Sequence, residues 1–515
     1  MEKDWFKAEK QDIVERLINT LESEALQFIG KFNSVEDKDF GFFTDVRSVS
    51  GVRKYYPTND GSPDDLNSRP LEVWSKKTIL FNAGKNKIIL EEGKWYKFYA
   101  VPAQSQLAVK NDNPFLLQTD LSRAIDIKPF KGSELIDNIQ QDSIRTPESV
   151  KGKLTRSIEA ISNEINTQPA TFIFELIQNA DDYPNDQNNV RMSFDIKSPY
   201  LVVKHNGSRF DVNNTVAICD INEGDKRSEV EKIGFKGIGF KSIFKDCNLA
   251  YLKSGDYSFR FDEMKWRNEG RKLFWQITPI NTDDKEYQNE LIPYDNVNLV
   301  IHPREKSQLT SYKTTLIEHF KDERILLFLR NVKQIDFKLN EDSFSISNTA
   351  NKWRILKSKD IVVDDHIRDE LNRGISLNDK RVPLKFQGIQ ITDIGFGFLV
   401  EDNVVKNIED ATIYAYLPTK VNLGFGFLLN GNFIPDGSRT HLHQDLSWNE
   451  FLFEKSGEQF PNKLLELIEC GIDASSVLEL LPDFDKLLDV NDDEIIQFIR
   501  SFQKGFYQSI EEIEL

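Results

Sequence analysis

Cysteine and histidine are scarce in this 515-residue sequence, which holds three of the first and six of the second. Three scattered cysteines are too few for a structural zinc site or a disulfide framework. The histidine spacing nearest to a ligand pair is His441-x-His443, and two histidines at strand spacing are more typical of exposed side chains than of a metal site. The sequence therefore favours a protein of a reducing compartment.

Long apolar runs are missing as well. No stretch approaches the roughly 18 apolar residues that a membrane helix needs, and the start, Met-Glu-Lys-Asp-Trp, lacks the basic and then apolar order of a signal peptide. We find no long internal repeat and no low-complexity tract. The formal net charge of −17 argues against a protein that coats duplex DNA without specificity. These absences predict a cytoplasmic protein without a membrane partner.

The most informative stretch that is present spans residues 171–182, Thr-Phe-Ile-Phe-Glu-Leu-Ile-Gln-Asn-Ala-Asp-Asp. Glu175, Asn179 and Asp182 are spaced i, i+4 and i+7, which puts them on one face of an α-helix. A glutamate can act as general base toward a water, and an asparagine can offer its amide oxygen to Mg²⁺. For this stretch alone, an amphipathic helix with an ordinary solvated face is the alternative interpretation.

A glycine-rich segment follows at residues 232–242. Gly234, Gly237 and Gly239 are spaced i, i+3 and i+5, which lets the backbone pass close to a polyphosphate with amide N–H groups and a helix N-terminus facing the negative charge. Such glycine spacing is weak evidence alone. Placed behind the 171–182 helix, with a His205-Asn-Gly207 turn between them, it becomes strong evidence for a nucleotide site.

In this order, the helix, the Asn-Gly turn and the glycine segment resemble the Bergerat nucleotide fold of the GHKL ATPases, and within them the sacsin-like and heat-shock-chaperone-like domains. The resemblance implies that Glu175 polarises the attacking water, that Asn179 holds Mg²⁺ and that Asp182 lies near the adenine or ribose of ATP. It implies that the three glycines line the phosphates. The further nucleotide-binding residues in these motifs are His205, Asn206, Gly207, Lys236, Phe240 and Lys241.

Two positions depart from the superfamily pattern. Most GHKL proteins carry Asp where this chain has His205. A neutral imidazole nitrogen accepts a hydrogen bond without adding charge, and protonation near pH 6.5 removes that acceptor. The expected strand 297–301 also lacks the usual Gly-Thr pair. Adenine selectivity is therefore left open, and a histidine that caps a strand end is the alternative interpretation.

The N-terminal part reads as short strands with Gly and Asn turns, which predicts a small β-barrel. Its aromatic strands resemble a cold-shock-type OB domain, in which unpaired bases stack on aromatic rings for about 1–3 kcal/mol per base. Residues 28–110 hold thirteen Lys and Arg against ten Asp and Glu, a basic balance in an acidic chain. A barrel for protein contacts, with its aromatics in the core, is the alternative. The candidate nucleic-acid residues are Lys31, Phe40, Phe42, Phe81 and Trp95.

Beyond the glycine segment, a block of helix and strands resembles the S5-like second domain of these ATPases, which often gives a cation to the γ-phosphate. The candidate here is Arg439, in a Ser438-Arg439 loop, whose guanidinium would stabilise charge on the transferred phosphoryl group. An ordinary surface arginine is the alternative. The helical, acidic C-terminal stretch is either a solvated face or a surface for a protein partner.

The predicted fold is an α+β multidomain protein, because the chain is too long for one core. Its predicted parts are an N-terminal helix (1–27), a cold-shock- or OB-like β-barrel (28–112), a connector (113–150), a Bergerat α/β sandwich (151–305), an S5-like second domain (306–455) and a helical tail (456–515).

The leading functional hypothesis is an ATPase that uses ATP and Mg²⁺ as a molecular switch. Its nucleotide cycle opens and closes either two protomers of a nucleotide-dependent homodimer or two domains, and its barrel senses single-stranded RNA or DNA. From architecture alone, antiviral defence or nucleic-acid maintenance is a further hypothesis. A chaperone-like ATPase that remodels protein clients is the second hypothesis. A nucleotide-binding scaffold without turnover is the third.

Overall fold

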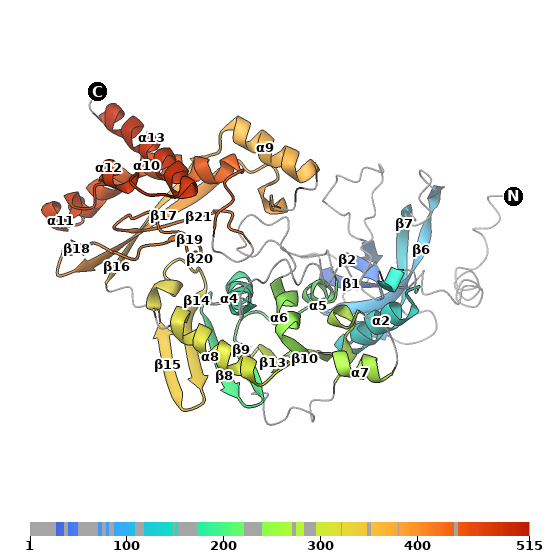
Figure 1. Cartoon of the computed structure of the whole chain (residues 1–515). Coiled ribbons are helices and arrows are strands. Elements are labelled where there is room, and N and C mark those ends of the chain that lie inside the picture. Colours follow the sequence, from blue (N-terminus) through green and yellow to red (C-terminus); the bar gives the residue numbers. More distant parts are fainter. Residues whose placement is uncertain are drawn as a thin grey trace.

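In the part of the chain that the structure describes, three sheets of five, eight and six strands follow one another, with a separate two-stranded hairpin near the N-terminus (Figure 1). This arrangement confirms the predicted α+β multidomain class. None of the helices in the described part of the chain combines the length and apolar character of a bilayer-crossing segment. The computed structural model describes residues 27–34, 40–49, 71–74, 79–81, 87–108, 118–147, 150–152, 172–220, 239–269, 274–282, 295–320, 322–347, 352–377, 379, 381–436 and 441–513.

The N-terminal sheet is antiparallel and has the strand order β3-β2-β1-β6-β7. Its two edge strands, β3 and β7, lie beside each other, so the five strands form a ring. Residues 118–129, predicted as part of a connector, instead form strand β7, and the predicted N-terminal helix lies outside the described residues. The elements of this part are β1 (Gln27–Ser34), β2 (Phe40–Ser48), β3 (Leu71–Trp74), β4 (Ile79–Phe81), β5 (Lys87–Ile89), β6 (Trp95–Ala108), β7 (Gln118–Pro129) and α2 (Gly132–Arg145).

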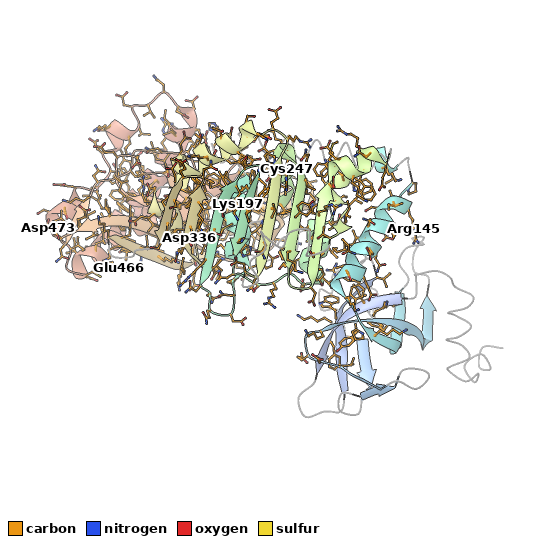
Figure 2. All side chains as sticks on the ribbon, turned by 90° about the horizontal axis from the view of Figure 1, so that it is seen from below. Arg145, Lys197, Cys247, Asp336, Glu466 and Asp473 are labelled. Atoms are coloured by element: carbon orange, nitrogen blue, oxygen red, sulfur yellow. The ribbon has the colours of Figure 1, made fainter. Side chains whose placement is uncertain are left out.

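Helix α2 joins this ring to the middle of the molecule. Lys97 on β6 contacts Glu134 on α2 at 2.6 Å, and Asn281 on β12 donates to the Ser133 carbonyl of α2 at 2.8 Å. A Cβ at Gly132 would lie 2.5 Å from the Asp256 carbonyl, so only glycine fits this close approach. The ring is therefore held at one edge of the eight-stranded sheet (Figure 2).

The eight-stranded sheet has the order β12-β11-β10-β13-β9-β8-β14-β15, and its one parallel pair is β8 with β14. Helices α4 and α8 pack on one face, where Phe172 meets Tyr312 at 5.1 Å between ring centroids. Figure 2 looks onto the sheet from the opposite side. The elements are α4 (Phe172–Asp182), β8 (Val190–Lys197), β9 (Tyr200–His205), α5 (Val212–Ile218), η3 (Gly239–Ser242), α6 (Ile243–Asp246), β10 (Cys247–Ser254), β11 (Tyr257–Asp262), α7 (Glu263–Asn268), η4 (Trp275–Ile277), β12 (Ile280–Asn281), β13 (Val297–Pro303), α8 (Ser307–Phe320), η6 (Glu323–Leu326), β14 (Val332–Leu339) and β15 (Asp342–Ser347).

The division expected at residue 306 does not coincide with a change of sheet. Helix α8 and strands β14 and β15, expected in the second domain, belong to the eight-stranded sheet and its core. The reason is pairing between distant segments: β14 lies parallel to β8, and Phe337 stacks on Phe194 with ring centroids 5.7 Å apart. The next sheet begins at β16.

The C-terminal sheet has the order β16-β17-β21-β19-β20, with β18 beside β17. Gly395 and Gly397 on β17 leave room for the ring of Phe328, while Phe396 and Phe398 face the other side, toward the C-terminal helices. The elements are β16 (Trp353–Val362), α9 (Asp365–Ser376), η7 (Leu384–Phe386), β17 (Ile391–Glu401), β18 (Val404–Lys406), β19 (Ile413–Ala415), β20 (Leu417–Pro418), β21 (Leu428–Gly431), α10 (Ser447–Glu469), α11 (Ala474–Leu478), α12 (Phe484–Leu487) and α13 (Asp493–Ile513).

The helices expected as a separate tail cover this last sheet. Phe460 of α10 lies 4.3 Å from Phe427 and 5.7 Å from Phe502 of α13, between ring centroids. Helices α10 and α13 cross closely at two glycines, where no side chain would fit. A Cβ at Gly457 would lie 2.0 Å from the Phe502 carbonyl, and one at Gly505 would lie 1.8 Å from the Glu454 carbonyl. The helical prediction is confirmed, but the helices form a core with the sheet.

We expect Gly505→Ala to lower the free energy of unfolding of the C-terminal part by about 1–3 kcal/mol, because the added methyl group overlaps backbone atoms of α10. Urea unfolding of the whole chain measures this. Gly152→Ala is the control, since nothing lies within 4 Å of its added carbon. Equal unfolding curves for the Gly505 variant and wild type would contradict the close crossing.

Candidate nucleotide-binding site

Helix α4 carries the three predicted polar side chains on its accessible face. Glu175, Asn179 and Asp182 are each partly exposed, whereas Ile173 and Ile177 are fully buried. The predicted helix and its two faces are therefore confirmed. Glu175 makes no hydrogen bond or ion pair with any residue that the structure describes. This carboxylate is available to a ligand or to a water.

The buried Asp181 fixes the C-terminal end of α4. Its side chain is 1% exposed and accepts the backbone N–H groups of Arg330, Asn331 and Val332 at 3.2, 2.7 and 2.8 Å. Burial raises the pKa of the Asp181 carboxyl, and the three N–H donors oppose that shift. The carboxylate thus ties α4 to the start of β14.

The His205-Asn-Gly207 turn ends β9 next to the loop that follows α4. Ser208 donates its N–H to the Tyr183 carbonyl at 2.8 Å, and Arg191 donates its N–H to the Asn206 side chain at 2.7 Å. A Cβ at Gly207 would lie 2.5 Å from the same Tyr183 carbonyl. Only glycine permits this approach, which brings the turn to the end of α4 that carries Asp182.

The imidazole of His205 is partly buried, and its Nδ1 accepts the N–H of Gly207 at 3.2 Å. Burial lowers the pKa of His205 to about 4. The ring is therefore neutral at pH 7, with its proton on Nε2, since Nδ1 is the acceptor. The acceptor role expected for this position is taken up inside the turn, and the ring offers a donor instead.

The last part of the glycine segment lies against α4. Gly239, Phe240 and Lys241 belong to η3, which contacts α4. Phe240 packs against Phe244 with ring centroids 5.8 Å apart. Lys241 is 2% exposed, and its Nζ lies 3.4 Å from the Ile218 carbonyl at the end of α5. Its predicted contact with nucleotide stays a prediction.

Several predicted residues of the site fall on positions outside the described residues, namely Gly234, Lys236, Gly237 and Arg439. The segments that flank Arg439 are described. Asp436 donates its N–H to the His441 carbonyl at 3.0 Å, and His443 donates its N–H to the Ile434 carbonyl at 3.1 Å. Residues 434–436 and 441–443 thus form the paired base of a hairpin, which we call the hairpin base.

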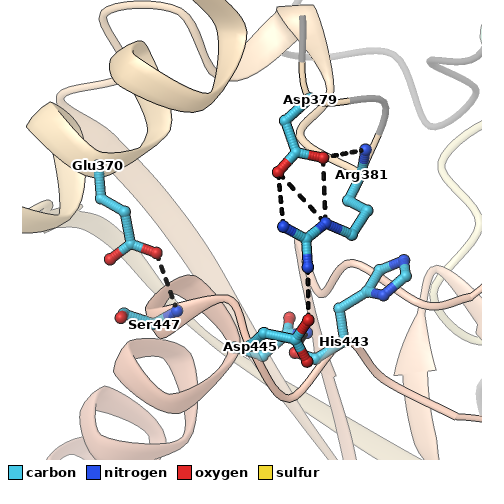
Figure 3. Close-up of polar contacts among 7 residues, drawn as sticks. Glu370, Asp379, Arg381, His443, Asp445 and Ser447 are labelled. Atoms are coloured by element: carbon cyan, nitrogen blue, oxygen red, sulfur yellow. Dashed lines mark hydrogen bonds and ion pairs between the residues drawn. The ribbon is translucent and has the colours of Figure 1, made fainter. Parts of the chain in front are cut away.

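An ionic cluster holds the chain just after the hairpin base (Figure 3). Arg381 pairs with Asp379 at 2.7 Å and also with Asp445, and Ser447 donates its N–H to Glu370 at 3.3 Å. The Arg381 guanidinium lowers the pKa of the Asp379 carboxyl. His443 lies beside this cluster in Figure 3. The exit of the hairpin is therefore anchored to residues 370–381.

The predicted nucleic-acid residues fall on two sheets. Lys31 on β1 pairs with Trp95 on β6, and Phe42 on β2 pairs with Asn33. Trp95 is half-buried and packs against the core that α2 shares. Phe40 also lies on β2, whereas Phe81 belongs to the separate β4–β5 hairpin. Their use in base stacking stays a prediction.

Asp181, which sequence analysis missed, left a usable signal. It follows Ile173 and Ile177 at intervals of four, so helical periodicity puts a carboxylate on the buried face. A charged residue at such a position needs hydrogen-bond partners. Its partners, at residues 330–332, carry no recognisable motif.

We expect Asp181→Asn to lower the free energy of unfolding by about 2–3 kcal/mol, because an amide offers one oxygen and places N–H donors against the backbone N–H groups. Urea unfolding measures the change. Asp182→Asn, on the accessible face, is the matched control and should cost less than about 1 kcal/mol. A similar loss in both variants would show that the buried contacts are not what matters.

His205 makes stability depend on pH. Its folded pKa of about 4 lies below the unfolded value, so the unfolded chain binds the proton first, and its contribution to stability is lost as pH falls from about 6.5 to 4. His205→Asn keeps an acceptor for the Gly207 N–H and does not titrate. Unfolding free energies at pH 7, 6 and 5 should therefore fall more steeply for wild type than for the variant, and parallel curves would refute the assignment.

No protein-family model matches the chain. It is 25% identical over 359 residues to Protein NO VEIN of Arabidopsis thaliana, a match that covers 64% of this chain and 13% of that protein. It is 26% identical over 206 residues to Sacsin of Homo sapiens, which covers 35% of this chain and 4% of Sacsin. The chain thus spans a small part of the length of both relatives. The similarity to Sacsin indicates a sacsin-like relationship over the 206 residues that match.

Proposed function

We propose that the chain is a Mg²⁺-dependent ATP-binding and ATP-hydrolysing switch of the GHKL type. The observation that carries the proposal is the unpartnered, partly exposed carboxylate of Glu175 on the same helix face as Asn179 and Asp182. The His205 turn lies at one end of this helix, and η3, which ends the glycine segment, lies against it. The sequence similarity to Sacsin supports the same proposal.

The donor set fits the expected ligands. The amide oxygen of Asn179 and the carboxylates of α4 are oxygen donors of the kind that Mg²⁺ takes beside phosphate oxygens. Asn179 would hold the ion, which neutralises phosphate charge when bound. Gly234, Gly237 and Gly239 would let backbone N–H groups approach the phosphates.

The proposed chemistry assigns proton transfer to Glu175. Its carboxylate would orient the attacking water and accept a proton from it, a contribution that is typically worth about 10²- to 10⁴-fold in rate. Arg439 would stabilise negative charge on the transferred phosphoryl group. His205 would meet the base as a donor through Nε2–H, so it would pair with an acceptor atom of the purine rather than with the adenine amino group.

We further propose that the N-terminal ring senses single-stranded RNA or DNA. Its strand neighbours, β1-β2-β3-β7-β6 around the ring, follow the order of an OB barrel, which supports an OB-like domain. Helix α2 fixes the ring to the edge of the eight-stranded sheet, so a movement of the ring on binding nucleic acid would be transmitted through α2 to that sheet. A nucleotide-dependent homodimer and a role in antiviral defence complete the hypothesis.

Glu175→Ala tests the ATPase proposal. We expect wild type to hydrolyse Mg-ATP and the variant to bind ATP with unchanged affinity while its turnover falls by about 10²-fold or more. Steady-state phosphate release and equilibrium nucleotide binding measure the two quantities. Asn179→Ala should weaken Mg-ATP binding. Binding without Glu175-dependent turnover would favour the scaffold alternative.

A short single-stranded oligonucleotide tests the sensing proposal. We expect it to change the ATPase rate of wild type and to have no effect on Phe40→Ala/Phe42→Ala, because stacking on two rings is worth about 2–6 kcal/mol in total. The double variant should keep its basal rate. Stimulation by unfolded protein instead of the oligonucleotide would favour the chaperone-like alternative.

A further inference from the structure

Residues 324–330, which lead into strand β14 of the second sheet, also contact the third sheet. Arg324 binds both carboxylate oxygens of Asp410 at 2.8 Å, and the ring of Phe328 lies where a Cβ of Gly397 would be 3.1 Å away. Two residues further on, Arg330 donates its backbone N–H to Asp181 of α4. Residues 324–330 therefore hold the C-terminal sheet against the helix that carries Glu175.

Tyr416, between β19 and β20, meets this segment in a strained conformation. Its φ of +63° lies in the left-handed region, which costs a bulky residue on the order of 1–2 kcal/mol, so other contacts must hold it. The side chain of Asn430 accepts the Tyr416 N–H at 2.8 Å. Backbone strain that neighbouring contacts hold in place often marks a functional position.

The contacts of the Tyr416 side chain indicate what this function is. Arg330 donates from Nη2 to the Tyr416 hydroxyl at 2.7 Å, with its Cζ 4.6 Å from the ring centroid. The same hydroxyl donates to Asn432 at 3.2 Å. Tyr416 thus bridges the arginine that is fixed to α4 and a residue that comes two positions before the hairpin base.

The hairpin base is held on its other sides by α10 and α13. The side-chain oxygen of Asn449 accepts the Ile434 N–H at 2.9 Å, and Trp448 donates from its indole to the Asn432 carbonyl at 2.8 Å. On the opposite strand, the Leu442 N–H donates to Glu494 at 3.0 Å. The contact from α4 reaches this stretch at Asn432, through the Tyr416 hydroxyl.

We propose that Arg330 and Tyr416 are positioning residues that set where the hairpin base lies relative to helix α4. The path runs from the Asp181 carboxylate through Arg330, the Tyr416 hydroxyl and Asn432. Any effect of this path on catalysis would act through Arg439, which follows residues 434–436 in the sequence, and therefore rests on the proposed function. The positioning itself does not, because it concerns only contacts within the folded chain.

Hydrogen exchange of the whole chain without nucleotide tests the positioning. Tyr416→Phe removes two hydrogen bonds and leaves the ring, so we expect the amides of the hairpin base, at residues 434, 436 and 441–443, to exchange about five- to thirty-fold faster, while those of α13 beyond its first turns keep the wild-type rate. Arg330→Gln, which keeps the backbone bond to Asp181, should act in the same way. Tyr414→Phe is the control, since Tyr414 packs on Phe328 at 4.9 Å between ring centroids. Wild-type exchange rates at the hairpin base in Tyr416→Phe would overturn the proposal.

ATP turnover gives the second measurement. We expect Tyr416→Phe to lower kcat about tenfold or more with KM and ATP affinity within twofold of wild type, because a misplaced catalytic group costs rate rather than binding. Added to Arg439→Ala, it should lower kcat no further, whereas multiplied effects would overturn the role in positioning. A wild type without Glu175-dependent turnover would refute the proposed function, and the exchange rates would then still decide this inference.

Discussion

The carboxylate of Asp181 accepts the N–H groups of three consecutive residues and so holds helix α4 at the start of strand β14. Without this carboxylate, three backbone N–H donors would lack this acceptor, at a cost of about 1–3 kcal/mol for each buried donor left unpaired. Because β14 also lies parallel to β8, the Asp181 contact fixes α4 both to its own sheet and to residues 324–330, which contact the C-terminal sheet. The positions of Glu175 and of the hairpin base share this single reference point.

Local sequence patterns predicted the parts of the site that depend on neighbours in the chain. The faces of α4 follow from helical spacing, and Gly207 marks a turn where the Tyr183 carbonyl leaves no room for a side chain. The sequence also singled out His205, but not which nitrogen would be engaged. That depends on the Gly207 N–H folding back onto Nδ1, a detail of turn geometry that residue types do not specify.

Contacts between distant segments escaped prediction. Strands β8 and β14 are separated by most of the eight-stranded sheet in sequence, and an alternating strand pattern does not name its partner. The same applies to α10 and α13, whose apolar faces were visible while the sheet beneath them was not. Arg330 and Tyr416 belong to this class, since only the fold brings a strained tyrosine to an arginine that is 86 residues away.

The close crossing of α10 and α13 makes the two helices a single stiff body. Glu494, in the first turn of α13, binds the hairpin base, and the whole helix is 21 residues, or about 30 Å, long. Because backbone meets backbone at Gly457 and Gly505, neither helix can slide along the other without a clash. A small tilt of the hairpin base would therefore move α10 and α13 together as one rigid unit. The exposed ring of Tyr507 on α13 would move with them at the protein surface.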